Sequence, residues 1–277
     1  MVGYYVKRSH AEEFQRLNTP ITSGMWINAP DTSAHQLQEL IDNYGLDTNI
    51  VHDVTDNQEL SRIEFSGKDA YVFVRVPNLL TTGKVTSHPM LCVLRAGNFF
   101  TISTKTTVSP SEVMTFSRAT SSKQSVNLLL GVIASAVGQY EQALKHTERS
   151  IDDTGSRLKS REITNQDFIH FVIVEDNLTA CRMNLNGMLA TLQRLKDTTH
   201  TSLTAEHFEM LDDISLHLQQ LLVAVESYKG RVDSIRNAYG TVANNTLNQR
   251  MKTLTVFTVM IALPNLFYGM YGMNVNG

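Results

Sequence analysis

Residues 253–277 read TLTVFTVMIALPNLFYGMYGMNVNG and contain no charged side chain. About 20 mostly apolar residues in a helix suffice to cross the hydrocarbon core of a bilayer, which is roughly 30 Å thick. The stretch therefore predicts a membrane helix over 254–272, with the buried core helix of a soluble protein as the alternative. Arg250 and Lys252 come just before it. Because positive residues flank membrane helices on the cytoplasmic side, we expect most of the chain in the cytoplasm.

Small and polar residues recur every three or four positions along this apolar stretch. They are Thr255, Thr258, Ala262, Asn265, Gly269 and Gly272. Two interpretations fit such a line: close packing between membrane helices, which small residues permit, or the lining of a hydrated path. Asn265 favours the second, because an amide in lipid needs a partner or water.

The chain before the membrane stretch has the pattern of long helices. No proline occurs between Pro110 and Pro264, and this region is rich in Leu, Ala, Gln, Glu and Met. We predict a helical hairpin over 119–203 and a stalk over 204–253 that continues into the membrane helix. The expected helices cover residues 121–159, 164–196 and 204–272. At about 1.5 Å per residue the third is a rod of roughly 100 Å, too long for a compact domain.

A regular apolar seam runs along the stalk with alternating spacings of three and four. Its residues are Leu211, Ile214, Leu218, Leu221, Val225, Tyr228, Val232, Ile235, Tyr239 and Val242. Such a heptad pattern is typical of coiled coils. It fits a helix packed on its own antiparallel neighbour and equally a stalk made of several chains, and the two are compatible.

Residues 1–118 have a different pattern, which predicts an α/β domain. Short runs rich in β-branched and aromatic residues indicate strands. These runs are 2–6, 25–28, 62–65, 71–76, 90–94 and 99–102. Helical spacing over Ser33–Tyr44 and a capping pattern at Ser109 predict helices. The fold class expected for the whole chain is α+β: an α/β sandwich domain, an antiparallel pair of long helices, and a stalk helix that becomes a transmembrane helix.

Composition excludes several function classes. A net charge of −3 and a pI near 6.3 give no basic surface for nucleic acid. Cys92 and Cys181 stand far apart in apolar segments, as expected of two buried thiols in a reducing compartment. The histidines are scattered without zinc-ligand spacing, and the sequence has no phosphate-binding loop or nucleophile motif. We therefore expect no enzyme activity.

The segment Tyr271–Asn274, placed after a membrane helix that extends a long cytoplasmic one, resembles the signature of the CorA family of magnesium channels. The run from Asn248 to Thr255 and the later Pro264 are similar to that family's first membrane helix. Met25–Ile27 with Pro30, and Arg62–Glu64 before a strand, also match. The resemblance thus spans nearly the whole chain.

This resemblance implies a homopentamer in the cell (inner) membrane whose five copies line a central pore. Carried over by position, Gly272, Met273 and Asn274 form the outer mouth. The residues implied to line the pore are Asn248, Met251, Leu254, Thr255, Thr258, Ala262, Asn265 and Gly269. Ala262 is smaller than the residue expected there. Because Mg²⁺ keeps its water and prefers oxygen ligands, a ring of neutral oxygens suits passage of the hydrated ion.

The same resemblance places Asp213 at a regulatory divalent site between subunits, where cytoplasmic Mg²⁺ would hold the pore closed. Without this resemblance, Asp212 and Asp213 would be interpreted as an ordinary pair of solvated acidic residues. The partner acid on the adjacent copy is left open among Asp53, Asp56, Glu59, Glu64 and Asp69.

Two alternatives remain at this stage. One is a zinc transporter of the same architecture, since the signature does not separate Mg²⁺ from Co²⁺, Ni²⁺ or Zn²⁺. The other is a coiled-coil scaffold anchored in the membrane without transport. The family continues beyond its signature with an acidic loop and a second membrane helix, so we expect conduction to need more chain than the segment ending at Gly277.

Overall fold

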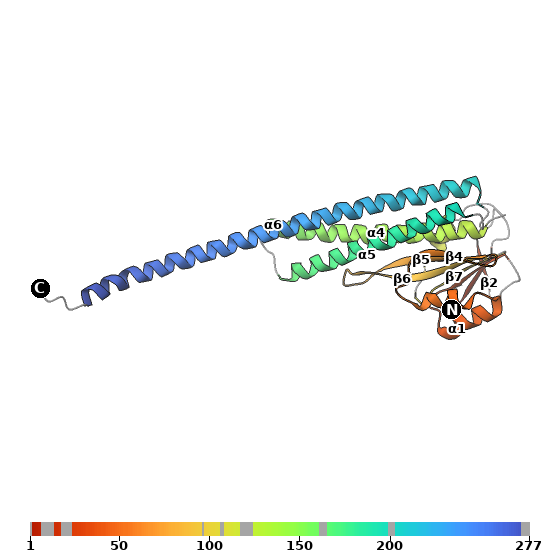
Figure 1. The fold of residues 1–277 in the computed structure, drawn as a ribbon, viewed down its shortest axis with the longest axis horizontal. Coiled ribbons are helices and arrows are strands. Elements are labelled where there is room, and N and C mark those ends of the chain that lie inside the picture. The colour runs from red at the N-terminus through yellow and green to blue at the C-terminus, as the bar shows by residue number, and fades with distance from the viewer. Residues whose placement is uncertain are drawn as a thin grey trace.

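The fold is taken from a computed structural model, which describes residues 2–6, 14–17, 24–95, 97–105, 108–116, 124–160, 165–198 and 203–272. It has a sheet domain at one end and three long helices, one of which runs far beyond everything else (Figure 1). The predicted α+β class is confirmed.

A mixed seven-stranded sheet forms the centre of the N-terminal domain, with strand order β2-β1-β3-β7-β6-β5-β4. The strands are β1 (Gly3–Val6), β2 (Gln15–Leu17), β3 (Met25–Ala29), β4 (Arg62–Ser66), β5 (Asp69–Leu79), β6 (Val85–Arg95) and β7 (Asn98–Ile102). β3 and β7 pair in parallel, and every other neighbouring pair is antiparallel. All six strands expected from sequence are present, and β2 was not predicted.

Helices cover both faces of this sheet, because the side chains of its central strands alternate between two cores. Tyr71 and Phe73 of β5 pack in one core with α1 (Ala34–Tyr44) and α2 (Thr48–His52). Val72 and Val74 belong to the other core, which is shared with the long helices. Figure 1 shows α1 and the long helices on opposite sides of the sheet. Two short elements complete the domain: the 3-10 turn η1 (Asp53–Thr55) and helix α3 (Pro110–Phe116).

The long helices are α4 (Gln124–Ser160), α5 (Asn165–Asp197) and α6 (Ala205–Gly272). Each begins and ends within a few residues of its prediction. Leu211, Leu218, Val225 and Val232 of the seam are buried in the core shared with α4 and α5. The single-chain interpretation of the seam is therefore correct as far as Val232.

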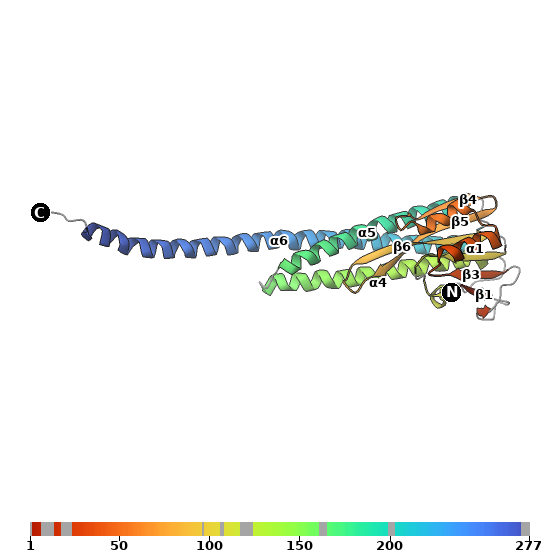
Figure 2. The same cartoon turned by 90° about the horizontal axis from the view of Figure 1, so that it is seen from below.

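Beyond the bundle, α6 continues as a single helix that no other described part of the chain covers (Figure 2). Every residue from 243 to 272 is exposed, including large apolar ones such as Phe257 and Ile261. α6 is the one described helix that is long and apolar enough to cross a membrane, and the apolar window within it is not buried in the protein. The soluble-core alternative for residues 254–272 is therefore wrong for this chain.

Candidate ion pathway and regulatory surface

The residues implied to line a pore all lie on the projecting part of α6 and are all exposed. They are Asn248, Met251, Leu254, Thr255, Thr258, Ala262, Asn265 and Gly269. Leu254 is 67% exposed and Met251 is 58% exposed, so large apolar side chains are exposed beside the polar ones. Among the described residues of one chain, no other helix or strand covers this line.

The threonine hydroxyls of this line are already bound to the helix backbone. The Oγ1 of Thr258 donates to the carbonyl of Leu254 at 2.9 Å, and that of Thr255 donates to the carbonyl of Met251 at 2.9 Å. Each hydroxyl proton is thereby used, while the oxygen keeps lone pairs that can accept. Thr255 and Thr258 therefore present acceptors, which suit the water hydrogens around a hydrated cation.

The outer mouth is described only in part. Gly272 is the last residue of α6, and the predicted mouth residues Met273 and Asn274 lie outside the described residues.

Asp213, the implied regulatory residue, lies on α6 near the sheet end of the bundle and is exposed. It borders a groove of about 370 Å³ between α6 and α4, whose floor includes Val137 and Gly138. At its rim Nε2 of His217 lies 3.4 Å from Oε2 of Glu141. Hydrogen bonding to Lys145 lowers the pKa of the Glu141 carboxyl, which keeps it ionised.

The neighbouring Asp212 does not line this groove and forms an ion pair with α5. Nζ of Lys196 lies 2.6 Å from Oδ1 of Asp212. The two adjacent aspartates thus have different surroundings, and Asp213 is the one turned to the groove. Within the described part of one chain, no group of three His, Cys, Asp or Glu side chains is arranged to hold a metal ion.

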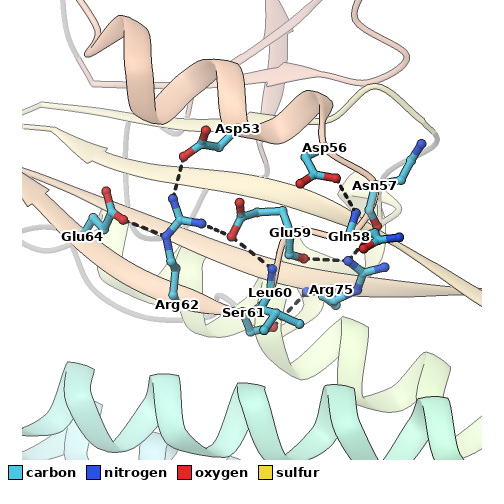
Figure 3. Close-up of polar contacts among 10 residues, drawn as sticks. All are labelled: Asp53, Asp56, Asn57, Gln58, Glu59, Leu60, Ser61, Arg62, Glu64 and Arg75. Atoms are coloured by element: carbon cyan, nitrogen blue, oxygen red, sulfur yellow. Dashed lines mark hydrogen bonds and ion pairs between the residues drawn. The ribbon is translucent and has the colours of Figure 1, made fainter.

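Most acids considered as partners of Asp213 are bound to arginines. The Arg62 guanidinium contacts the carboxylates of Asp53 at 2.7 Å and Glu64 at 2.7 Å, and it also contacts Glu59 (Figure 3). It also stacks over the Phe73 ring at 4.4 Å.

Two candidate acids lie outside the Arg62 cluster. Asp69 lies 3.5 Å from Arg95. Asp56 accepts the backbone N–H of Gln58 at 2.8 Å and has no ion pair among the described residues.

A buried arginine that sequence reasoning missed fixes the loop between η1 and β4, which carries Asp56 and Glu59. Nη1 of Arg75 donates to the carbonyls of Asn57 at 2.9 Å and Glu59 at 2.6 Å, and Nη2 donates to the carbonyl of Ser87 at 2.8 Å. Arg75 is 7% exposed, and burial lowers the pKa of its guanidinium. Its place inside a strand rich in valine was the one available signal, because a charge there must find partners.

Comparisons with known proteins agree with this architecture. The family model described as CorA-like Mg²⁺ transporter protein matches residues 23–277. YfjQ of Bacillus subtilis (strain 168), whose name describes a metal ion transporter, is 30% identical over 98 residues. That match covers 35% of this chain and 31% of YfjQ, so the matched part spans about a third of the relative.

Solved structures show the same fold. The complete CorA magnesium transporter from Methanocaldococcus jannaschii aligns over 100% of this chain and 88% of its own, with a TM-score of 0.85 and 17% identity. The ZntB cytoplasmic domain from Vibrio parahaemolyticus RIMD 2210633 covers 88% of this chain and 98% of its own, with a TM-score of 0.68 and 9% identity.

Proposed function

The chain belongs to the family of CorA-like Mg²⁺ transporter proteins, and we propose that five copies assemble in the cell membrane around a path for hydrated Mg²⁺. Membership of this family supports the broader statement that the protein is a divalent metal ion transporter and not an enzyme. The observation that carries the proposal is the exposed line on α6 from Asn248 to Gly269, in which the neutral side-chain oxygens of asparagine and threonine stand among apolar and small residues.

Neutral oxygens suit this cargo. Mg²⁺ releases its water reluctantly, so a path that accepts hydrogen bonds from the hydration shell avoids the cost of stripping the ion. A carboxylate ring would hold the ion more tightly and slow its exit, and conduction needs weak successive sites. No acid occurs between Asp233 and Gly277, so every side-chain oxygen offered by this stretch is uncharged.

Gly272, Met273 and Asn274 would form the outer mouth, with the Asn274 amide facing the incoming ion. Leu254 and Met251 would form the narrow apolar positions below it, and Asn248 would lie at the cytoplasmic exit. Arg250 and Lys252 support an orientation with the sheet domain in the cytoplasm.

Regulation would act at Asp213. The proposal is that cytoplasmic Mg²⁺ bridges Asp213 to an acid on the sheet domain of a neighbouring copy and stabilises the closed stalk. Exposure of Asp213 beside a groove supports it. Among the candidate acids Asp56 is favoured, because the other candidates already contact arginines and would have to give up those contacts.

A zinc transporter is the second candidate, because the fold is shared with the ZntB cytoplasmic domain. The test is uptake of radioactive or fluorescently reported Mg²⁺ and Zn²⁺ into liposomes that contain the intact protein. Uptake of Mg²⁺ in preference to Zn²⁺ is the expected result, and the reverse order would favour the zinc alternative. Uptake of neither ion, in protein that is correctly inserted, would favour the coiled-coil scaffold.

A further inference from the structure

The buried Arg75 of β5 joins a loop of the sheet domain to strand β6. We call residues 56–61, between η1 and β4, the acid loop, because they carry two of the candidate acids. Nη1 of Arg75 donates to the carbonyls of Asn57 and Glu59 in this loop (Figure 3). Its Nε donates to Oγ of Ser87 at 3.0 Å, and its Nη2 donates to the carbonyl and to Oγ of Ser87, both at 2.8 Å. Arg75 therefore binds the acid loop and β6 at the same time.

These contacts use every donor of the guanidinium. An arginine has five N–H groups, and the five hydrogen bonds of Arg75 go to carbonyl and hydroxyl oxygens. A buried charge needs such partners, because its burial without them is costly. The acid loop therefore cannot move away from β6 without leaving donors of a buried cation unpaired.

The link continues from β6 to helix α5. Nδ2 of Asn184 donates to Oγ of Ser87 at 3.0 Å, and Asn184 is buried. The acid loop also lies directly against α5, because a Cβ on Gly187 would lie 3.6 Å from Cβ of Ser61. Oγ of Ser61 in turn accepts the backbone N–H of Arg75 at 3.3 Å. The loop, the sheet and α5 are thus joined through a continuous set of contacts.

Helix α5 is bound on both sides of this link to α6, which carries Asp213. Nη1 of Arg182 lies 3.1 Å from Oε1 of Glu226, and Nζ of Lys196 lies 2.6 Å from Oδ1 of Asp212. The acid loop and Asp213 therefore hold set places relative to each other within one chain. An ion that bridges two copies depends on those places, because Mg²⁺ demands near-ideal octahedral geometry from its ligands.

We propose that Arg75 is a positioning residue for the proposed regulation by metal. Through Ser87 it holds the acid loop, and with it Asp56, in the place from which the carboxylate reaches the bridging ion. The proposal rests on the proposed function and adds a residue that acts through the loop backbone. Arg62 contacts carboxylates directly, whereas Arg75 binds carbonyls of the loop and so sets its position without occupying a carboxylate.

Two substitutions and a matched control separate loop position from overall stability. Arg75→Lys keeps the charge but has three N–H donors in place of five, so it cannot hold both the loop and Ser87. Ser87→Ala keeps the contacts of Arg75 with carbonyls and removes the hydroxyl that connects it to Asn184. Asn177→Leu is the control, because it removes buried hydrogen bonds between α5 and the β5–β6 hairpin outside the acid loop.

Amide hydrogen exchange of the intact protein measures the position of the loop. The N–H of Gln58 donates to Oδ1 of Asp56 at 2.8 Å, and the N–H of Glu59 donates to the carbonyl of Asp56 at 3.1 Å. Both amides should exchange at least about tenfold faster in Arg75→Lys than in wild type, which corresponds to about 1.4 kcal/mol less protection. Asn177→Leu should leave their exchange unchanged, since a loop opens locally and independently of the bundle.

The Mg²⁺ concentration that gives half-maximal protection of the stalk from protease tests the link to regulation. Arg75→Lys should raise this concentration at least about tenfold, and Ser87→Ala should shift it in the same direction. Asn177→Leu should lower thermal stability without shifting it. In an Asp56→Asn background, Arg75→Lys should cause no further shift, because both substitutions act on the same ligand.

Unchanged exchange at Gln58 and Glu59 in Arg75→Lys would overturn the proposal. Equal shifts of the Mg²⁺ midpoint in Arg75→Lys and Asn177→Leu would overturn it as well, because the effect would then be one of general stability. Failure of the proposed function looks different: Mg²⁺ would give the wild-type stalk no protection. In that case the exchange result alone decides whether Arg75 holds the loop.

Discussion

Ile235 of α6 packs directly on Gly155 of α4, so that a Cβ on Gly155 would lie 3.3 Å from Cδ1 of Ile235. This contact lies where α6 leaves the bundle, close to the contact between Arg231 and Asp152. The glycine lets the two helices approach closely at the base of the projecting stalk, and the position of the stalk depends on that approach.

Gly155→Leu should therefore lower the stability of the bundle by about 1–3 kcal/mol, because the added side chain overpacks a tight contact. Thermal unfolding of the intact protein, followed by helical content, measures the effect. The double variant Gly155→Leu/Ile235→Ala should recover part of the loss, since it removes the side chain that clashes. Equal losses in the single and double variants would show that the contact does not set the packing.

Asn177 of α5 joins the long helices to the tip of the β5–β6 hairpin. Its Oδ1 accepts the N–H of Val85 at 2.8 Å, and its Nδ2 donates to the carbonyl of Gly83 at 2.8 Å. Asn177→Leu should cost about 1–3 kcal/mol, because two backbone groups lose their partner. Asn186→Leu, at an exposed position of the same helix, is the matched control and should change unfolding little. Similar losses in both variants would contradict the bridging role.

Asp47 gives a prediction about pH. It caps α2 through the N–H groups of Asn49 and Ile50. The hydrogen bond from Ser66, followed by the N–H of Ile50, lowers the pKa of its carboxyl below the ordinary value of 3.8. The unfolded chain therefore binds this proton more readily than the folded one, so the stabilisation is complete above 3.8 and is lost as the pH falls through the folded pKa.

Asp47→Ala should thus cost about 0.5–2 kcal/mol near neutral pH. The difference from wild type should narrow below pH 3.8, as measured by denaturant unfolding at a series of pH values. A difference that stays constant down to the lowest pH at which the protein folds would show that the charge does not contribute.

Asp213 and Asp212 offer a matched pair for the proposed regulation. Mg²⁺ should protect the wild-type stalk from protease, and Asp213→Asn should abolish most of that protection because it removes a negative ligand. Asp212→Asn should retain it, since Asp212 is paired with Lys196. Protection lost equally in both variants would point to a general effect of charge.

The fold could be predicted where the physical signal is local. The absence of proline after Pro110 and the seam from Leu211 onward predicted α4, α5 and α6 to within a few residues. The short strand β2, the short helix α2 and the 3-10 turn η1 were not predicted, because elements of three to five residues form mainly through tertiary contacts.

The surroundings of the candidate residues could not be predicted in the same way. The spacing of apolar residues along the stalk puts Asp213 next to a seam residue. The groove that Asp213 borders is also lined by Gly138 of α4, which is far away in sequence. The carboxylates around Arg62 come from η1, from the loop after it and from β4, and the carbonyls around Arg75 come from that loop and from β6. Only the three-dimensional structure therefore shows which acids already have a cationic partner.

The most direct test of the central claim is Mg²⁺ uptake by the intact protein carrying Asn274→Ala, compared with Asn244→Ala, which removes an amide from the stalk. If neutral oxygens at the outer mouth receive the hydrated ion, Asn274→Ala should reduce uptake at least about tenfold, as expected for the loss of about 1.4 kcal/mol of ion binding. Asn244→Ala should retain most of the activity. Uptake by Asn274→Ala equal to wild type, at equal amounts of protein in the membrane, would contradict the account.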